Sequence, residues 1–497
     1  MSKKINNLIL NTDSYKLSHY MQYPPGSKNV HSYIEARGSS DPDVTEVVHF
    51  GVQSFIKEYL LERITMADVI DSSLFAAEHG VPFNREGWEY IVKAHNGYLP
   101  IVINTVPEGT PVPIGNQVVS VFATDPNCAW LVSYIETALL RAVWYGSTVA
   151  TLSREVKRVI LDSLRRTSDD PENEIMFKMH DFGARGVSSQ ESAGLGGAAH
   201  LINFMGTDTI AGILHAKEFY EAGACGFSIP ASEHSTMTSW GEHCEFDAYK
   251  NMVEVYAKPQ ATFACVIDSY DWERAIDLWT TCPPDEEMSL TDRVKQAGAT
   301  VVLRPDSGHP VDTPVRVVEM LIERLGASNN SKGYLVLPDH VRVIQGDGIG
   351  KNEIVQILQK LEDRGISASN IAFGVGGGLL QKVNRDTFKF AMKASAILIE
   401  DTWRDVFKLP KGQPDKASKR GRLLTLKHHL TGQFVTVNYD DGDQFREGGY
   451  ENTMFTAYSS HRGTVKTAFI SFDRVRQNAI IPVPEEEKED DPTALRF

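Results

Sequence analysis

The sequence predicts an α/β fold, in which a parallel sheet with crossover helices adjoins a mostly antiparallel, β-rich part. From about residue 150 onward, short β-rich runs alternate with polar or glycine-rich turns and then with helical patterns. A strand, a polar turn and a helix, repeated several times, are typical of a parallel sheet. Before residue 150, Pro and Gly turns separate the β-rich runs, as is typical of antiparallel sheets.

Each strand and helix of the parallel part is placed by its residue pattern. The expected strands are the runs IMFKMH, FACVI, TVVLR, VRVIQ and NIAFG. The segment 351–365 predicts a helix that ends near Gly365, and the segment 315–326 predicts one that closes at Gly326. The apolar faces of these two helices consist of Ile354, Ile357, Leu358 and Leu361, and of Val318, Leu321, Ile322 and Leu325.

Charged and polar residues follow these strands at the point where each strand ends. Because the carboxyl ends of parallel strands meet at one edge of a sheet, these residues are expected to lie close together, as in the active site of a barrel enzyme. So many charged groups at strand ends are hard to explain by packing. The residues are Asp181, Asp208, His234, Asp268, Arg304, Asp306, Asp347 and the glycine cluster at Gly376.

The segment AFGVGGGLLQK could form a phosphate-binding loop, because successive glycines free backbone N–H groups ahead of a helix. It matches neither the dinucleotide fingerprint nor the Walker A motif, since Leu379 takes the last Gly position and no Gly-Lys-Ser/Thr follows. Alone it could equally be a tight strand-to-helix turn. Together with Gly346, Asp347 and Gly348, one strand earlier, it favours phosphate binding.

The other candidate residues each have a second interpretation. Arg304 and Asp306 could bind phosphate and magnesium, or could form an ion pair that closes a turn. Asp268 is either a functional carboxylate or a helix cap. His234 is a lone histidine, and most lone histidines are not catalytic. Phe182 could stack on a flat ring, or could be an ordinary core residue.

Composition excludes several classes of function. The chain of 497 residues has 65 acidic and 50 basic side chains, a formal net charge of −15, which argues against nucleic acid or an anionic membrane as partner. Its five cysteines form no CxxC pair, and no signal-peptide core or membrane-length apolar run is present. We therefore expect reduced thiols and a cytoplasmic location.

Ten segments of the sequence together resemble the family of nicotinate and nicotinamide phosphoribosyltransferases, and they occur in the family's order. They are TDSYKLSHYMQYPPGS, HDFGARGVSSQESAG, GTDT, SIPASEHST, DSYD, RPDSG, SKGY, VIQGDG, IAFGVGGGLLQK and SKRGRL. The resemblance implies a type II phosphoribosyltransferase fold: an irregular α/β barrel with a companion domain built from both chain ends. It also implies a homodimer with shared active sites. Residues 1–150 and 401–484 would form the companion domain, 151–400 the catalytic barrel, and 485–497 an acidic tail.

The implied reaction joins nicotinamide to phosphoribosyl pyrophosphate, giving nicotinamide mononucleotide and pyrophosphate. Phe182 and, from the second subunit, Tyr15 match the two aromatic faces that enclose nicotinamide, and Arg185 matches a residue beside the ring. Asp208 matches the acceptor for the carboxamide N–H, and Ser228 is a further substrate-binding candidate. A carboxylate also repels the carboxylate of nicotinate at close range, so Asp208 predicts selectivity for the amide.

The resemblance assigns the sugar, the phosphates and the cofactors as well. Arg304 and Asp306 match ribose and pyrophosphate contacts, with Asp306 and Asp268 as expected magnesium ligands. His234 matches a histidine that ATP phosphorylates, which would make the reaction ATP-stimulated. The remaining matches to phosphate and ribose contacts are Gly346, Asp347, Gly376, Gly377 and Arg385, and, from the second subunit, Arg37, Lys393, Lys408 and Lys416.

Two alternatives stay open on the sequence alone. A nicotinate phosphoribosyltransferase would share the scaffold and the phosphoribosyl donor, and Asp208 argues against it. A barrel that binds a phosphosugar, either for isomerase or aldolase chemistry or without catalysis, belongs to a different class. The enzymatic version needs a Schiff-base lysine or a Glu base at a strand end, and neither is evident.

Overall fold

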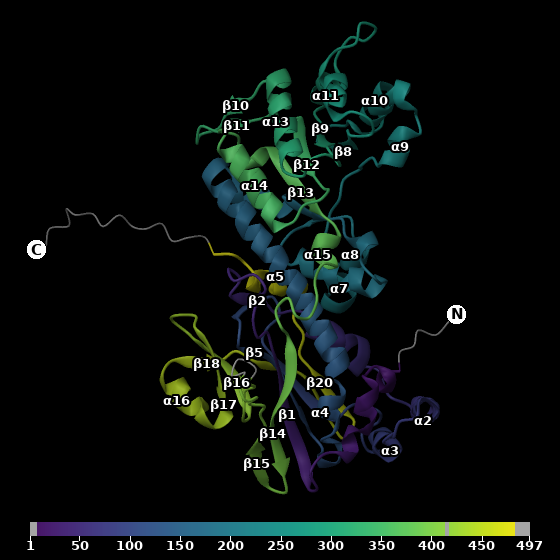
Figure 1. Cartoon of the computed structure of the whole chain (residues 1–497), viewed down its shortest axis with the longest axis vertical. Coiled ribbons are helices and arrows are strands. Elements are labelled where there is room, and N and C mark those ends of the chain that lie inside the picture. The colour runs from purple at the N-terminus through teal and green to yellow at the C-terminus, as the bar shows by residue number, and fades with distance from the viewer. Residues whose placement is uncertain (1–6, 413–416, 483–497) are drawn as a thin grey trace, which may run out of the picture.

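A computed structural model describes residues 7–412 and 417–482 of the chain. The molecule has two parts, one built on a parallel sheet and the other on an antiparallel sheet (Figure 1). The long helix α5 (Glu136–Thr167) runs from one part into the other and packs on elements of both. The expected acidic tail at 485–497 and Lys416 lie outside the described residues.

The parallel sheet has six strands in the order β7-β6-β13-β12-β9-β8, and every neighbouring pair is parallel. The strands are β6 (Met179–Asp181), β7 (Gly206–Thr207), β8 (Thr262–Val266), β9 (Thr300–Arg304), β12 (Val341–Gln345) and β13 (Ile371–Val375). The IMFKMH run is shorter as a strand than predicted, because Ile175–Phe177 form a 3-10 turn ahead of β6.

The segment 227–232 joins the two edges of this sheet into an irregular barrel. The N–H of Thr207, in β7, donates to the carbonyl of Phe227 (2.9 Å). On the other side, the N–H of Ala264, in β8, donates to the carbonyl of Pro230 (2.8 Å), and Ser232 donates back to Ala264 (3.1 Å). Parallel bridges at both contacts fit a barrel strand that is too irregular to extend. The α/β barrel expected from the sequence is confirmed.

Helices cover the outside of the barrel, and both helices predicted from apolar periodicity are present. In α14 (Lys351–Glu362) the buried residues are the four that the pattern predicts. The helix α13 (Asp312–Leu325) ends at Gly326, which has a φ of +77° that an L side chain rarely adopts. The other barrel helices of five or more residues are α7 (Gln190–Leu201), α8 (Ile210–Tyr220), α9 (His234–Thr238), α10 (Glu245–Tyr256), α11 (Trp272–Thr280) and α12 (Leu290–Ala297).

The companion part is an antiparallel sheet of seven strands drawn from distant regions of the chain, in the order β15-β14-β1-β5-β3-β19-β20. Its strands are β1 (Ser27–Glu35), β3 (Ile101–Thr105), β5 (Gln117–Ala123), β14 (Ala391–Ile399), β15 (Thr402–Asp405), β19 (Phe455–His461) and β20 (Thr464–Thr467). The expected companion domain built from both chain ends is thereby confirmed; its predicted residue limits stay a prediction.

Smaller elements complete the companion part. The strands are β2 (Glu46–Val48), β4 (Pro111–Pro113), β16 (Leu423–His428), β17 (Phe434–Asn438) and β18 (Tyr450–Asn452). The helices are α1 (Val52–Phe55), α2 (Met66–His79), α3 (Arg85–Ala94), α4 (Leu131–Tyr134) and α16 (Gly442–Glu447). The last helix, α17 (Phe472–Asn478), packs on the barrel instead, because its buried Phe472 and Val475 belong to the apolar cluster of the barrel. Each of the two parts has its own cluster of buried apolar side chains.

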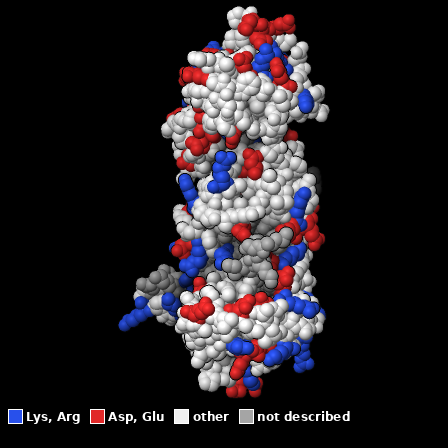
Figure 2. Space-filling model, turned by 90° about the vertical axis from the view of Figure 1, so that its right-hand side faces the viewer, with Lys and Arg blue, Asp and Glu red and all other residues white. Residues whose placement is uncertain are grey.

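Two further features of the described residues are the lengths of the helices and the charges on one face of the surface. Among the described residues, no helix combines the length and the apolar character that crossing a bilayer requires. Acidic and basic side chains are intermixed over the face shown in Figure 2. Neither sign of charge dominates this face.

Candidate active site

The residues that follow the parallel strands gather at one edge of the barrel, as the sequence predicts. Phe182 follows β6, Asp208 follows β7, and Arg304 is the last residue of β9. Gly346 and Gly376 follow β12 and β13. Because these strands are parallel and adjacent, their carboxyl ends form a single polar rim.

A cavity of about 720 Å³ extends from this rim into the barrel. Phe182, Asp208, Ser228 and Arg304 line its rim end. Its walls include small or aliphatic residues of the barrel strands, namely Ala264, Val302, Ile344 and Ala372. Binding sites for small flat ligands commonly combine such apolar walls with a few polar groups.

The ring of Phe182 is seated against two glycines. A Cβ atom added at Gly374, in β13, would lie 2.1 Å from Cε2 of Phe182, so no other residue fits there without moving the ring. A Cβ at Gly346 would lie 3.4 Å from the same atom and 3.5 Å from Oδ1 of Asp306. Gly346, expected in the sugar-phosphate cradle, therefore also lies beside the aromatic ring.

Asp208 presents its carboxylate at the cavity with a hydroxyl already bound to it. The Ser228 hydroxyl donates a short hydrogen bond to Oδ1 of Asp208. The backbone N–H of Asp208 donates to the carbonyl of Asp181 (2.9 Å), which fixes the loop after β7 to the end of β6. One carboxylate oxygen is thus positioned by Ser228, and a carboxylate can accept further hydrogen bonds from an amide ligand.

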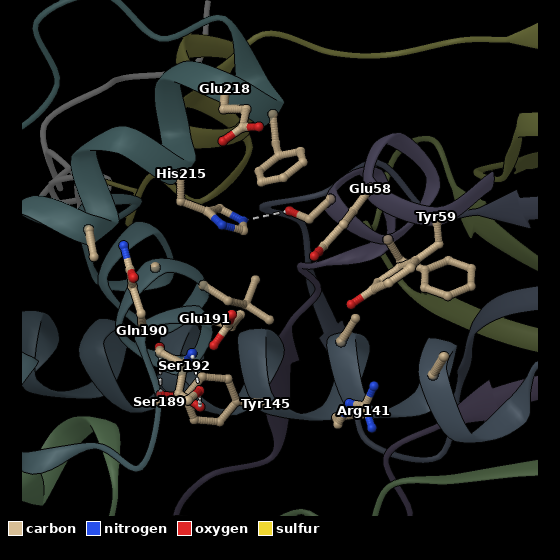
Figure 3. Close-up of a pocket in the computed structure, with 18 of the residues that line it drawn as sticks. Glu58, Tyr59, Arg141, Tyr145, Ser189, Gln190, Glu191, Ser192, His215 and Glu218 are labelled. Carbon is tan, nitrogen blue, oxygen red and sulfur yellow. Dashed lines mark hydrogen bonds between the residues drawn. The ribbon is translucent and has the colours of Figure 1, made fainter. Parts of the chain in front are cut away.

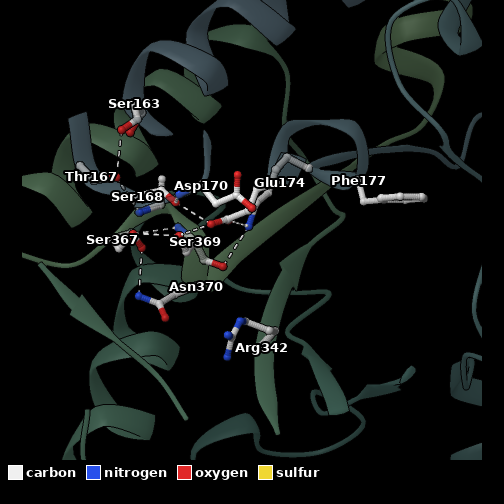
Figure 4. A network of polar contacts seen from close by, with 12 residues as sticks. Ser163, Thr167, Ser168, Asp170, Glu174, Phe177, Arg342, Ser367, Ser369 and Asn370 are labelled. Carbon is white, nitrogen blue, oxygen red and sulfur yellow. Dashed lines mark hydrogen bonds and ion pairs between the residues drawn. The ribbon is translucent and has the colours of Figure 1, made fainter. Parts of the chain in front are cut away.

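A charged network lies at the opposite end of the cavity (Figure 4). Lys178 forms an ion pair with Glu174 (3.0 Å) and donates to the carbonyl of Ser369 (2.9 Å). Burial lowers the pKa of Lys178, while Glu174 opposes that shift. Arg342 also lines this end. The cavity therefore has a charged group at each end and apolar walls between them.

Beside Arg304, the rim holds a group of acidic residues and a histidine. Arg304 lies 3.6 Å from Oδ2 of Asp306. Burial raises the pKa of Asp306; Arg304 opposes this shift, and the negative charges of Asp268 and Asp347 add to it. His234, at the start of α9, lies with Nε2 3.0 Å from Oδ1 of Asp268, whose side chain is 4% exposed. These contacts unite the expected catalytic residues in one region.

Several expected site residues do not line the cavity around Phe182. Tyr15 lies in the 3-10 helix Ser14–Met21 of the companion part, and its side chain is 59% exposed. Arg37 follows β1, Lys393 lies in β14, and Lys408 follows β15, all in the companion sheet region. Arg185 and Arg385 belong to the barrel part and are exposed.

Two other sites within the described chain hold none of the expected residues. A cavity of about 850 Å³ lies between α5, α7, α8 and the segment 54–62 (Figure 3). The buried groups of His95, Asp125 and Cys128 lie within 4.8 Å of one another. However, His95 accepts the N–H of Arg462 at Nδ1 (3.1 Å), so its Nε2 carries the proton that it donates to Asp125 (2.9 Å). That tautomer leaves no lone pair for a metal.

Comparison with known proteins places this geometry in a family. A profile described as "Nicotinate phosphoribosyltransferase (NAPRTase) family" matches residues 177–459, and one described as "Nicotinamide phosphoribosyltransferase, N-terminal domain" matches residues 7–103. The chain is 50% identical to a nicotinamide phosphoribosyltransferase of Xanthomonas campestris pv. campestris, over 88% of this chain and 91% of that one. It is 33% identical to a nicotinamide phosphoribosyltransferase of Acinetobacter baylyi, over 92% and 94% of the two chains.

The chain belongs to the nicotinamide phosphoribosyltransferase family.

Solved structures support the fold of this nicotinamide phosphoribosyltransferase family member. A nicotinate-nucleotide pyrophosphorylase from Pyrococcus furiosus superposes with a TM-score of 0.60 at 15% identity, covering 96% of this chain and 97% of that one. Human nicotinic acid phosphoribosyltransferase gives a TM-score of 0.52 at 14% identity, covering 94% and 92%. At such low identity the likeness concerns the fold alone.

Reasoning from the sequence missed several residues of the cavity. His180, in β6 and two residues before Phe182, lines the cavity, and burial lowers the pKa of His180. Lys178 and Glu174 form its far end. Gly374 could have been found, because a glycine inside a strand often marks the close approach of another group. The glycine run that follows it concealed this signal.

We expect the Gly374→Ala substitution to raise the KM for the aromatic substrate by about tenfold to a hundredfold. The new methyl group would displace the Phe182 ring by occupying its place. Steady-state kinetics on the purified variant measure this effect. Gly223→Ala is the matched control, since a Cβ at Gly223 meets no atom within 4 Å. An unchanged KM in Gly374→Ala would contradict the role given to the ring.

Proposed function

We propose that this chain transfers the phosphoribosyl group of phosphoribosyl pyrophosphate to the ring nitrogen of nicotinamide. The observation that carries the proposal is that Phe182 and Asp208 line one cavity at the ends of two adjacent strands, β6 and β7. The first offers an aromatic face, and the second an acceptor for an amide N–H. Both named relatives are nicotinamide phosphoribosyltransferases, which supports the same substrate here.

The chemistry requires little proton transfer. The ring nitrogen attacks the anomeric carbon with its lone pair, while the bond to the pyrophosphate oxygen breaks and its electron pair leaves with pyrophosphate. No proton has to be removed from that nitrogen, so a strong general base is unnecessary. The protein's tasks are to orient the ring and to stabilise the leaving anion. Phe182 and Asp208 serve the first task, and Arg304 serves the second.

Asp208 favours nicotinamide over nicotinate. The carboxamide donates a hydrogen bond to Asp208, whereas the carboxylate of nicotinate would be repelled by it. The Ser228 hydroxyl donates to Oδ1 of Asp208, which leaves Oδ2 to accept from the carboxamide. Asp208 is therefore the main reason to propose nicotinamide, and not nicotinate, as the substrate that receives the phosphoribosyl group.

The sugar and phosphate would bind along the other half of the rim. Gly346–Gly348 and Gly376–Gly378 follow adjacent strands, and backbone N–H groups of such loops can bind phosphate. A Cβ at Gly376 would meet only the Phe182 carbonyl, at 3.8 Å, so the space beside this loop is open. Arg385, exposed in the loop after α15 (Gly377–Leu380), is available to bind phosphate as well.

The acidic side chains of this rim fit a magnesium ion bound together with the substrate. Asp306 and Asp268 offer only oxygen ligands. Burial raises the pKa of Asp306, Arg304 opposes this shift, and the negative charge of Asp268 adds to it. Magnesium commonly uses one or two carboxylates together with substrate phosphates, which suits this arrangement. When bound, the ion would neutralise part of the charge on pyrophosphate. Asp306 and Asp268 would hold it, and Arg304 would contact the same anion.

We infer that ATP stimulates the reaction through phosphorylation of His234. The ion pair with Asp268 orients the imidazole ring at the rim, where phosphate groups are expected. We expect His234→Ala to abolish stimulation by ATP while retaining the basal synthesis of nicotinamide mononucleotide. The measurement compares initial rates with and without ATP. His243→Ala, at an exposed histidine, serves as the control and should keep the stimulation. Full stimulation in His234→Ala would contradict the inference.

We also infer a homodimer in which Tyr15 of the partner subunit completes the base site. Within one chain Tyr15 is exposed and lies in the companion part, whereas Phe182 lies in the barrel. If the sites are shared, Tyr15→Ala and Asp306→Ala chains should complement each other. Random pairing of equal amounts would give one intact site in half of the dimers, about a quarter of wild-type activity. A mixture as inactive as the separate variants would contradict shared sites.

The proposed function is tested by incubating the purified chain with nicotinamide, phosphoribosyl pyrophosphate and magnesium, and by quantifying nicotinamide mononucleotide and pyrophosphate. We expect equal amounts of both products, and none when the phosphoribosyl donor is omitted or when magnesium is chelated. Absence of product under the complete conditions would contradict the proposal. If the amount of product does not change when magnesium is chelated, only the role given to magnesium is contradicted, and the proposed reaction stands.

A further inference from the structure

We propose that Asp181 is a positioning residue, which holds the loop that carries Phe182 and the loop that carries Asp208 in one fixed arrangement. The inference rests on the proposed function, because it takes Phe182 and Asp208 as the groups that bind nicotinamide. Asp181 is the last residue of β6, and its side chain is fully buried. It therefore acts from behind the site and does not touch the substrate.

The side chain of Asp181 fixes the turn that follows Phe182. Its Oδ1 accepts the backbone N–H of Gly183 at 2.7 Å. The N–H of Phe182 itself donates to the carbonyl of Val375 at 3.0 Å. The backbone is thus held on both sides of the Phe182 Cα atom, which limits the directions that its ring can take. The glycines behind the ring then determine its depth.

The same residue is connected to the loop that carries Asp208. Asp181 is paired with Thr207 in the parallel register of β6 and β7, and its carbonyl accepts the N–H of Asp208 at 2.9 Å. Burial raises the pKa of Asp181, and Thr209, the residue after Asp208, faces its carboxyl group and opposes that shift. Movement of the Asp181 backbone or side chain would therefore change the spacing between the aromatic ring and the amide acceptor.

A stabilising role alone does not account for a carboxyl group at this position. Burial raises the pKa of Asp181 to about 6, so the ionised form is disfavoured by its surroundings. Within the described chain, its Oδ2 has no hydrogen-bond partner, and the hydroxyl of Thr209 has none of ordinary geometry. A buried polar atom without a partner costs folding free energy. An apolar residue of similar size would avoid that cost but would lose the bond to Gly183.

The decisive comparison uses Asp181→Val and Asp181→Asn, with melting temperature and steady-state kinetics for both substrates. Val removes the unpaired Oδ2 atom but also leaves the Gly183 N–H without its acceptor. These two effects oppose each other, so this variant should melt close to the wild-type temperature. It should nevertheless raise the KM for nicotinamide at least tenfold, while the KM for phosphoribosyl pyrophosphate changes less than twofold. Asn has a side chain of the same length as Asp and keeps an acceptor oxygen. We therefore expect the KM of the Asn variant for nicotinamide to lie within threefold of wild type.

The outcomes separate this inference from the proposed function. If wild type makes nicotinamide mononucleotide and Asp181→Val keeps the wild-type KM for nicotinamide, the inference is wrong and the function stands. Equal impairment of Val and Asn variants would also overturn it, since the acceptor would then not be the relevant feature. If Asp181→Val fails to fold, a nicotinamide KM for Asp181→Asn more than tenfold above wild type overturns it. A wild-type chain that makes no product overturns both.

Discussion

Replacement of Asp208 by Asn is expected to shift the preference between nicotinamide and nicotinate by about three orders of magnitude. Asn keeps an acceptor oxygen, but the hydrogen bond from nicotinamide changes from a charged to a neutral one, which removes about 1 kcal/mol from nicotinamide binding. Loss of a like charge about 4 Å from the nicotinate carboxylate relieves up to about 4 kcal/mol of repulsion near a protein surface. Both changes act in the same direction on the ratio of the two kcat/KM values.

The measurement is kcat/KM for each base, with phosphoribosyl pyrophosphate saturating. Ser228→Ala is the matched comparison, since it removes the hydroxyl that binds Asp208 and leaves the charge in place. We expect Ser228→Ala to lower kcat/KM for nicotinamide by no more than about tenfold, equivalent to one neutral hydrogen bond, and to keep the preference for the amide. An Asp208→Asn variant that still prefers nicotinamide as strongly as wild type would refute the electrostatic explanation of selectivity.

The protein is expected to lose stability steeply as the pH falls from about 6.5 to 4. Burial lowers the pKa of His49, His200 and His215 to about 3, and that of His31 to about 4. In the unfolded chain these histidines would titrate near 6.5. Between those values the unfolded state binds more protons than the native state. Acidification therefore favours unfolding, and the stability that neutral histidines provide is present above about pH 6.5.

Two buried carboxyl groups oppose this trend. Burial raises the pKa of Glu108 to about 7 and that of Asp181 to about 6, so in the native state they bind protons that the unfolded chain does not hold near pH 5. These four histidines and two carboxyl groups, taken by themselves, give a net uptake of about two protons on unfolding. The free energy of unfolding should then fall by roughly 3 kcal/mol per pH unit near pH 5.

Urea unfolding at several values of pH between 7.5 and 5 measures this slope. His49→Gln should reduce it by about one proton, because Gln can still donate to the Thr105 hydroxyl that His49 contacts at 2.7 Å. His243→Gln, at an exposed histidine, should leave the slope unchanged. A stability that stays constant between pH 6.5 and 5 would show that these histidines are protonated without unfolding, contrary to the explanation.

The sequence predicts most of the rim and much less of the cavity below it. Arg304 ends, and Gly376 follows, a strand with a strong β pattern, so their common edge follows from the fold class. Asp208 follows β7, which has only two residues and no such pattern. The seat of the Phe182 ring on Gly374 depends on side chains of adjacent strands that lie far apart in sequence. The segment 227–232, which joins the barrel edges, forms only isolated bridges to its neighbours. Such an irregular segment has no strand pattern that the sequence would reveal.

Buried polar groups were also difficult to predict. Asp181 was recognised as a strand-end residue, but its burial behind the base site depends on the packing of β6 between β7 and β13. Lys178 and Glu174 form their ion pair four residues apart, a spacing that is common on exposed helices as well. The exposure of Tyr15 could not be read from its sequence motif, and in the structure it is what supports a contribution from a second subunit.

The most direct test of the central claim is a competition between equal concentrations of nicotinamide and nicotinate. The wild-type protein is present at a low, catalytic concentration, together with phosphoribosyl pyrophosphate and magnesium. The ratio of the two mononucleotide products, measured by mass spectrometry at early times, equals the ratio of the two kcat/KM values. We predict that nicotinamide mononucleotide exceeds nicotinate mononucleotide by at least a hundredfold. A ratio near one, or an excess of nicotinate mononucleotide, would contradict the assignment of Asp208 as the residue that selects the amide.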